Sequence, residues 1–119
     1  MARLVLSLET AYRVMDIINL TPHTLNIFDE QGRETLEIEP SGQTARVETT
    51  REKVDEVAGV PIYETTTDEV VGLPEPKEDT LYVVSGFVCS EVDRSDVVSP
   101  GELIRNDDGN PIGAKGFSR

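Results

Sequence analysis

Apolar and polar residues alternate along much of the chain, which is the pattern of half-buried β-strands. In the first part of the chain the apolar positions of this pattern are Leu25, Ile27, Leu36, Ile38 and Val47. The polar cluster 29–32 ends in glycine and separates two such runs, so the pattern predicts a hairpin. A second turn at 40–42 is followed by 44–50, a β-rich segment that predicts a further strand.

The middle of the chain predicts more strand. Residues 51–59 could form two helical turns, but Gly59 and Pro61 end the segment early, so a strand and turn are favoured. Residues 62–71 include three consecutive threonines and predict a strand. The segment 72–76, with a glycine and two prolines, predicts a rigid connector.

The most apolar run, 81–85, is continuous rather than alternating and predicts a central strand covered on both faces. Residues 86–92 predict a short helix over the sheet, with Phe87 and Val88 turned inward. The cluster 106–109 predicts a hairpin turn between 102–105 and 110–115.

These elements predict a mainly β domain of antiparallel hairpins with one short helix near residues 86–92; an α+β class is the alternative. A chain of 119 residues and 13.1 kDa has room for one core. We expect this domain to span 15–119. Residues 1–14 look unlike the rest and predict an N-terminal extension outside the fold, with disorder as an open alternative.

The charge balance limits the classes of partner that the protein can bind. The formal net charge is −12, which opposes attraction to nucleic acid and to anionic membranes. The apolar run Leu4–Leu8 is far shorter than a membrane span, and the one cysteine cannot form an internal disulfide. These features predict a cytoplasmic protein, in the host cytoplasm if a phage encodes it, that binds neither nucleic acid nor membrane.

The residues needed for common catalytic sites are scarce. His23 is the only histidine and Cys89 the only cysteine, and the chain has no metal-binding cysteine spacing and no phosphate-binding loop. A Cys89–His23 nucleophile pair is disfavoured because Cys89 lies in an apolar segment. The sequence therefore predicts a protein that is not an enzyme and holds no metal or cofactor.

The segment Asn19-Leu20-Thr21-Pro22-His23 is compact and polar. One interpretation is a turn in which the Asn19 or Thr21 side chain bonds neighbouring backbone groups and His23 lies at the surface. The other makes Thr21 and His23 polar contacts to a ligand, held by a loop that Pro22 stiffens. The sequence leaves both open.

Cations are few, so Arg46, Arg94 and Arg105 stand out. Arg94 could pair with Asp96 to fix a loop, or these arginines could hold an anion. In the second case backbone amides near Gly101 or Gly113 and a base stacked on Phe87 would complete a nucleotide-like site. A ligand site needs at least two of the arginines in one cleft, whereas an interaction module would leave them in separate pairs.

The order of several short motifs is specific although each alone is not: the segment 19–23, Pro40-Ser41-Gly42, Gly72-Leu73-Pro74, Tyr82-Val83-Val84-Ser85, and Arg94-x-Asp96-Val97-Val98-x-Pro100-Gly101. Over residues 16–117 the chain resembles a small family of uncharacterised proteins encoded by phages, prophages and bacterial genomes. That resemblance implies no activity. In size and lack of catalytic groups the chain is also broadly similar to the sponge proteins that sequester signalling nucleotides of host defence, including the Thoeris anti-defence group, with no motif aligned.

Two functions follow as expectations. The first is a non-enzymatic protein that sequesters a small anionic, nucleotide-like signalling molecule, as phage counter-defence. Its candidate ligand-binding residues are Arg94, Arg105, Phe87, Arg46, Thr21, His23, Gly101 and Gly113. The alternative is a structural or protein-interaction module of a phage or prophage, without a small ligand. A small aliphatic core and short strands also predict a homo-oligomer.

Overall fold

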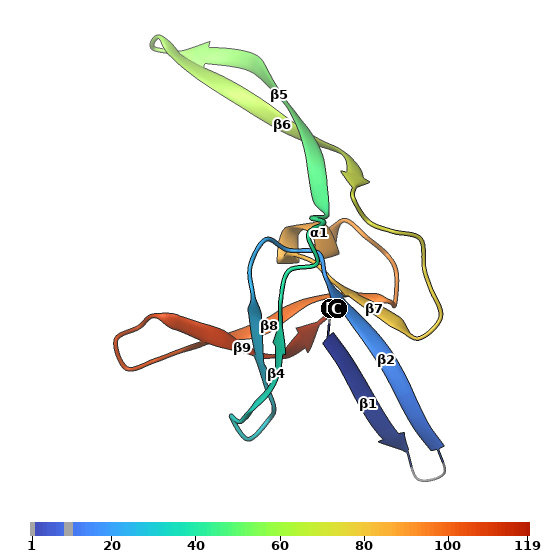
Figure 1. Cartoon of the computed structure of the whole chain (residues 1–119). Coiled ribbons are helices and arrows are strands. Elements are labelled where there is room, and N and C mark those ends of the chain that lie inside the picture. Colours follow the sequence, from blue (N-terminus) through green and yellow to red (C-terminus); the bar gives the residue numbers. More distant parts are fainter. Residues whose placement is uncertain (1, 9–10) are drawn as a thin grey trace.

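The structure is a computed structural model that describes residues 2–8 and 11–119, with side chains from residue 16 onward. It confirms the mainly β class, with antiparallel hairpins and one short helix in the described part of the chain (Figure 1). The elements are β1 (Ala2–Leu8), β2 (Ala11–Asn19), β3 (Leu25–Phe28), β4 (Glu34–Ile38), β5 (Arg46–Val57), β6 (Val60–Val71), β7 (Thr80–Val83), α1 (Gly86–Ser90), β8 (Val97–Arg105) and β9 (Pro111–Ser118).

Seven of the described strands form one sheet, in the order β1-β2-β7-β8-β9-β3-β4. The hairpins β1–β2, β3–β4 and β8–β9 are antiparallel, as the turn signals at 29–32 and 106–109 predict. The pairs that join these hairpins are parallel. β7 lies between β2 and β8 and is parallel to both, and β3 is parallel to β9. Long-range parallel pairing thus joins locally formed hairpins.

The sheet curls so that its two ends meet. Asn19, the last residue of β2, forms a parallel bridge with Pro40, which follows β4. The backbone N–H of Ser41 donates to the Asn19 carbonyl at 3.0 Å. β4 therefore lies against β2 and β1 and closes the curled sheet around its inner face.

β7 is buried on both faces, which confirms the prediction for its apolar run. Val83 packs in an inner cluster with Ile17, Ile27 and Ile38. Tyr82 and Val84 point the other way, into a second cluster. This outer cluster consists of Leu20, Ala45, Tyr82, Val84, Val88 and Val97. A strand that serves two cores has no solvent face, which is why its sequence is continuously apolar.

Helix α1 begins after Ser85, whose hydroxyl accepts a hydrogen bond from the Val88 backbone N–H at 3.3 Å. Val88 packs into the outer cluster, as expected. The expectation that Phe87 also points inward was wrong, since 53% of its surface is exposed. A five-residue helix turns less than two full turns, so it can direct few side chains at the sheet.

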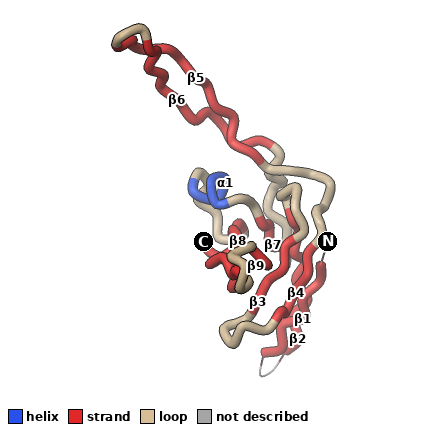
Figure 2. Tube along the Cα trace, turned by 90° about the vertical axis from the view of Figure 1, so that its left-hand side faces the viewer, coloured by secondary structure: helices blue, strands red, loops and turns tan. Residues whose placement is uncertain are grey.

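β5 and β6 form a separate two-stranded hairpin, the arm (residues 46–71), which projects from the rest of the molecule (Figures 1 and 2). At its base Val47 and Val70 pack against the outer cluster. Ala58 and Gly59, both at positive φ, form the two-residue turn at its end. The radius of gyration of the Cα atoms is 17.9 Å, against roughly 13–14 Å for a compact chain of this length. The chain is thus far from spherical.

The N-terminal expectation needs correction. We expected 1–14 to lie outside the fold, but β1 pairs antiparallel with β2 from Ala2↔Ile17 to Leu8↔Ala11. Residue 1 and residues 9–10 lie outside the described part. Pairing with β2, the other strand of the same hairpin, places β1 in the sheet.

A buried asparagine holds the closure of the sheet. The Asn19 side chain is fully buried, and its amide donates to the carbonyls of His23 at 2.7 Å and Ile38 at 3.1 Å. Its Oδ1 accepts from the Thr21 backbone N–H at 2.9 Å and from the Thr21 hydroxyl at 2.7 Å. One amide group therefore links the end of β2, the turn that follows and the end of β4.

Replacing Asn19 by aspartate should destabilise the fold strongly. A carboxylate cannot donate to the His23 and Ile38 carbonyls, and a buried acceptor without a donor costs roughly 1–3 kcal/mol. We expect Asn19→Asp to lower the free energy of unfolding by about 3 kcal/mol or more in urea denaturation at pH 7. The matched control Asn110→Asp, in an exposed turn, should change it by less than about 0.5 kcal/mol. Equal effects of the two substitutions would contradict the role of the amide.

Candidate functional site

An apolar cleft of about 510 Å³ lies between β3, β8 and β9. Leu103 and Ile112 contribute exposed aliphatic side chains to it, 51% and 44% exposed. Pro100 and Pro111 add further apolar surface. The lining consists of His23, Thr24, Leu25, Asn26, Ile27, Pro100, Leu103, Pro111, Ile112, Gly113 and Ala114. This set contains no arginine, lysine or carboxylate.

The two glycines proposed from the sequence are positions of close backbone approach. A Cβ at Gly113 would overlap the Asn26 carbonyl oxygen and the Phe28 ring, where β9 runs beside β3. A Cβ at Gly101 would overlap the carbonyl oxygen of Lys115 on the paired strand. These contacts account for both glycines through strand packing, without an anion.

The segment 19–23 lies at one edge of the cleft. The Thr21 hydroxyl is buried and bonds Asn19 Oδ1. The His23 backbone carbonyl accepts from Asn19, while the residue itself is exposed and lines the cleft. The turn interpretation therefore describes Thr21, and His23 is the polar residue of this segment that a ligand or partner in the cleft could reach.

Arg94 is held by its neighbours. Its Nε and Nη2 donate to the two oxygens of Asp96 at 2.9 and 2.7 Å, and its Nη1 donates to the Pro74 carbonyl at 3.0 Å. Its guanidinium carbon lies 5.8 Å from the centre of the Tyr82 ring. The arginine side chain is 25% exposed and the aspartate 20%. The guanidinium thereby fastens the connector after the arm to the start of β8.

This pair changes the ionisation of both groups. The hydrogen bonds from Arg94 lower the pKa of the Asp96 carboxyl from its ordinary value of 3.8, against the opposing effect of burial. The hydrogen bond to Asp96 raises the pKa of Arg94. Both groups are held in their charged forms at neutral pH, as expected for a bidentate pair.

The other two arginines have different partners. Arg46 lies at the base of the arm, where its Nε is 3.6 Å from a carboxylate oxygen of Glu48. Arg105 lies at the end of β8 and donates to the Gly109 carbonyl of the adjacent turn at 2.9 Å. Each of the three arginines therefore has its own local contact, and none is among the cleft lining.

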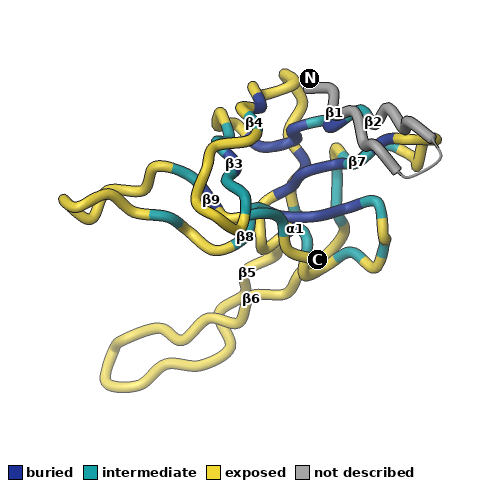
Figure 3. The backbone as a smooth tube through the Cα atoms, turned by 90° about the horizontal axis from the view of Figure 1, so that it is seen from below, coloured by how far each residue is buried: buried dark blue, intermediate teal, exposed yellow. Residues whose placement is uncertain are grey.

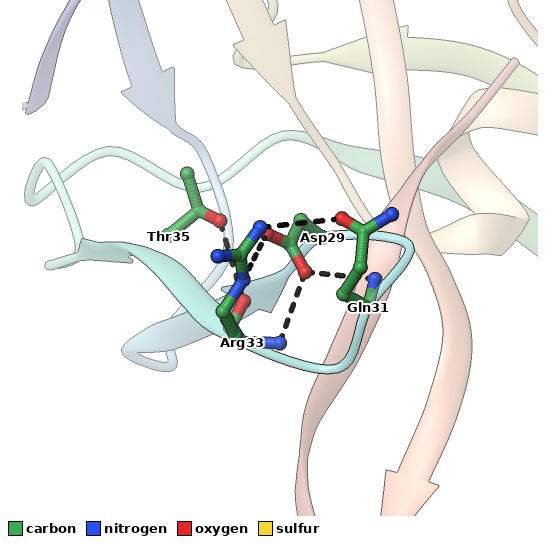
Figure 4. Close-up of polar contacts among 4 residues, drawn as sticks. All are labelled: Asp29, Gln31, Arg33 and Thr35. Carbon is green, nitrogen blue, oxygen red and sulfur yellow. Dashed lines mark hydrogen bonds and ion pairs between the residues drawn. The ribbon is translucent and has the colours of Figure 1, made fainter.

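The β3–β4 turn shows the same local use of charge (Figure 4). Asp29 Oδ1 accepts from the backbone N–H groups of Gln31 and Arg33, and its Oδ2 is 3.2 Å from Arg33 Nε. The backbone hydrogen bond from Arg33 is the main cause that lowers the pKa of the Asp29 carboxyl. This exposed group of residues stabilises a turn.

Another cavity, of about 170 Å³, is lined by Gly86, Cys89, Ser90, Ser99, Ser118 and Arg119. Cys89 thus lines a different cavity from His23. Among the described residues there is no group of three or more histidine, cysteine or acidic side chains placed to hold a metal ion. In the same part of the chain no helix is long and apolar enough to cross a membrane.

The sequence reasoning missed the apolar end of the arm. Val54, Val57, Val60 and Ile62, hereafter the apolar tip, are 43–63% exposed. Val57 pairs with Val60, and Ile62 lies two residues further along the same strand, so these three side chains share one face. The other face carries Tyr63, whose ring lies 4.0 Å from the Arg51 guanidinium carbon. The signal was present as the three valines at 54, 57 and 60, in and next to a segment assigned to strand and turn.

Comparison with known proteins found no matching family model, no matching curated protein and no matching solved structure. The candidate surfaces therefore rest on their own geometry.

Removing Arg94 should affect stability rather than a ligand. Arg94→Ala leaves Asp96 and the Pro74 carbonyl without their donors, so we expect the free energy of unfolding to fall by about 2 kcal/mol at pH 7. The pKa of the Asp96 carboxyl in the folded chain lies below its ordinary value. The ion pair therefore stabilises the fold fully above the pKa of the unfolded chain, and this stabilisation is lost as the pH falls through the pKa of the folded chain. The deficit of the variant should therefore shrink below about pH 3.8.

Urea denaturation of wild type and variant at pH 7 and pH 3 measures this. Arg105→Ala, which removes a hydrogen bond in an exposed turn, serves as the control and should cost less than about 0.5 kcal/mol at both pH values. A deficit of Arg94→Ala that stays constant with pH would contradict the pairing with Asp96.

Proposed function

We propose that the protein is a non-enzymatic interaction module whose arm binds a protein partner. The supporting observation is the arm itself. Two strands of twelve residues each have no third strand beside them in the described structure, and residues 48–69 are exposed throughout (Figure 3). An isolated two-stranded hairpin is marginally stable in water, so a partner that covers it would stabilise it.

The chemistry of the arm supports a protein partner. Its end carries four exposed aliphatic side chains with charged residues around them, a composition typical of protein-interaction surfaces. The tight turn at 58–59 holds the two strands in register, which reduces the entropy lost on binding. The partner that fits is one with an apolar recess about as wide as two strands.

Sequestration of a nucleotide-like anion is the alternative. It requires converging cations, and Arg46, Arg94 and Arg105 have separate partners. The cleft between β3, β8 and β9 offers mostly aliphatic surface. These observations favour the interaction module over the sponge.

Site-specific photo-crosslinking in the producing cells tests the proposal. A photoreactive residue replaces Ile62 at the apolar tip, and the matched control replaces Gln31 in the exposed β3–β4 turn. We expect covalent adducts to a protein, identified by mass spectrometry, at position 62 and not at position 31.

The alternative is measured in parallel by calorimetry with cyclic dinucleotides and ADP-ribose derivatives. Absence of protein adducts at position 62, together with heat of nucleotide binding that Arg105→Ala abolishes, would refute the interaction module and support the sponge.

A further inference from the structure

We propose that the partner of the apolar tip is the cleft of a second copy of this chain, so that copies associate arm into cleft. This inference rests on the proposed function and names its partner. It starts from the fact that one chain carries two unpartnered apolar surfaces of opposite shape. The tip projects at the end of the arm, and the cleft is recessed between β3, β8 and β9.

The tip has the form of a plug. A hairpin is about 10 Å wide, since two strands lie about 4.8 Å apart and carry side chains on their outer edges. The side chains of Val57, Val60 and Ile62 on one face are β-branched and lose little rotamer freedom when they are buried. The tip therefore offers rigid aliphatic surface at a small entropic cost.

The cleft has matching chemistry. Its exposed aliphatic residues, Leu103 and Ile112, come from the paired strands β8 and β9, where Leu103 pairs with Ala114, two residues beyond Ile112. Its lining contains no charged side chain that docking would strip of water, and His23 at the edge leaves one polar group for a backbone carbonyl of the arm. Aliphatic plug and aliphatic recess both gain from being removed from water.

The arm of a chain does not reach the cleft of the same chain. A twelve-residue strand spans about 40 Å, and the arm leaves the body at α1 in a different direction from the β8–β9 hairpin (Figure 1). The cleft lining contains no arm residue. When the tip of one copy enters the cleft of another, a single kind of contact covers both apolar surfaces. A different protein bound at the tip would leave the cleft uncovered.

The size of the contact predicts how copies assemble. A tip about 20 Å long and 10 Å wide covers roughly 200 Å² on each partner, well below the about 1,200 Å² in total that stable interfaces reach. One contact is therefore weak, and a reciprocal pair or a closed ring, in which every copy gives a tip and receives one, doubles the area that each copy buries. A net charge of −12 per chain adds repulsion, so salt should strengthen the association.

Sedimentation of matched variants tests this arrangement. The tip variant carries Val60→Thr and Ile62→Thr, and the cleft variant carries Leu103→Glu. The controls are Tyr63→Thr, on the opposite face of the arm, and Thr35→Glu, which adds the same charge at an exposed position outside the cleft. Far-UV circular dichroism establishes that each variant is folded.

At 10–500 µM protein and about 0.5 M salt, we expect the wild type and both controls to sediment with an average mass above the 13.1 kDa of one chain. The tip variant and the cleft variant should each remain at 13.1 kDa alone. Mixed in equal amounts at the upper end of this concentration range, they should form a reversible complex of two chains and nothing larger. It should be weaker than the wild-type assembly, because each pair has only one intact tip and one intact cleft. This rescue is specific to a contact between two different surfaces.

A second measurement does not depend on the variants. Adducts from a photoreactive residue at position 62 should map to residues 100–114 of an isotope-labelled second copy. A cleft variant that associates as well as the wild type would overturn the inference in favour of arm-to-arm pairing. A wild type that stays at 13.1 kDa while position 62 crosslinks to another protein would overturn the inference and leave the proposed function intact; no protein adduct at position 62 would refute both.

Discussion

The buried side-chain amide of Asn19 is the interaction on which the rest of the structure depends. It bonds the carbonyls of His23 and Ile38 and receives two hydrogen bonds from Thr21. Next to it, the Leu20 carbonyl accepts from the Ala45 backbone N–H at 3.0 Å, one residue before β5 begins. The same short segment thus closes the sheet, forms an edge of the cleft and fixes the base of the arm. A side chain with both donors and acceptors is needed there, because the groups it joins include both.

The distribution of charge follows from this arrangement. Polar side chains that could have formed an anion site are used within the fold: Arg94 fastens the connector to β8, and Arg105 bonds its own turn. Apolar surface is left over instead, at the arm tip and in the cleft. An acidic chain keeps such surface from aggregating through mutual repulsion, and this repulsion makes any contact depend on short-range fit.

Local signals predicted much of the fold. Turn residues at 29–32 and 106–109 lie where hairpins turn, the strand and turn favoured for 51–59 match the end of β5, and the continuous apolar run of β7 is central. The prediction for Phe87 was wrong because a helix of five residues has its facing set by its docking and not by its own periodicity. For 1–14, pairing with β2 decides the place of β1. At the candidate residues Gly101 and Gly113 the structure shows close approach of neighbouring strands, which leaves no room for a Cβ.

The sequence by itself determined the local elements, because turn geometry, strand alternation and the hydrogen bonds that join Asn19 to Thr21 and His23 all act between residues close in the chain. Tertiary structure decided which hairpins lie side by side, since parallel pairs such as β3 with β9 join segments about 85 residues apart whose contacts leave no periodic signal. It also decided what the arginines do. A guanidinium bonds whichever carbonyl or carboxylate the fold brings near, so Arg94 reaches the Pro74 carbonyl through a contact that no spacing rule contains. The arm and the cleft are exposed for the same reason: burial is a property of the packed chain, and the packing leaves the apolar side chains there about half exposed.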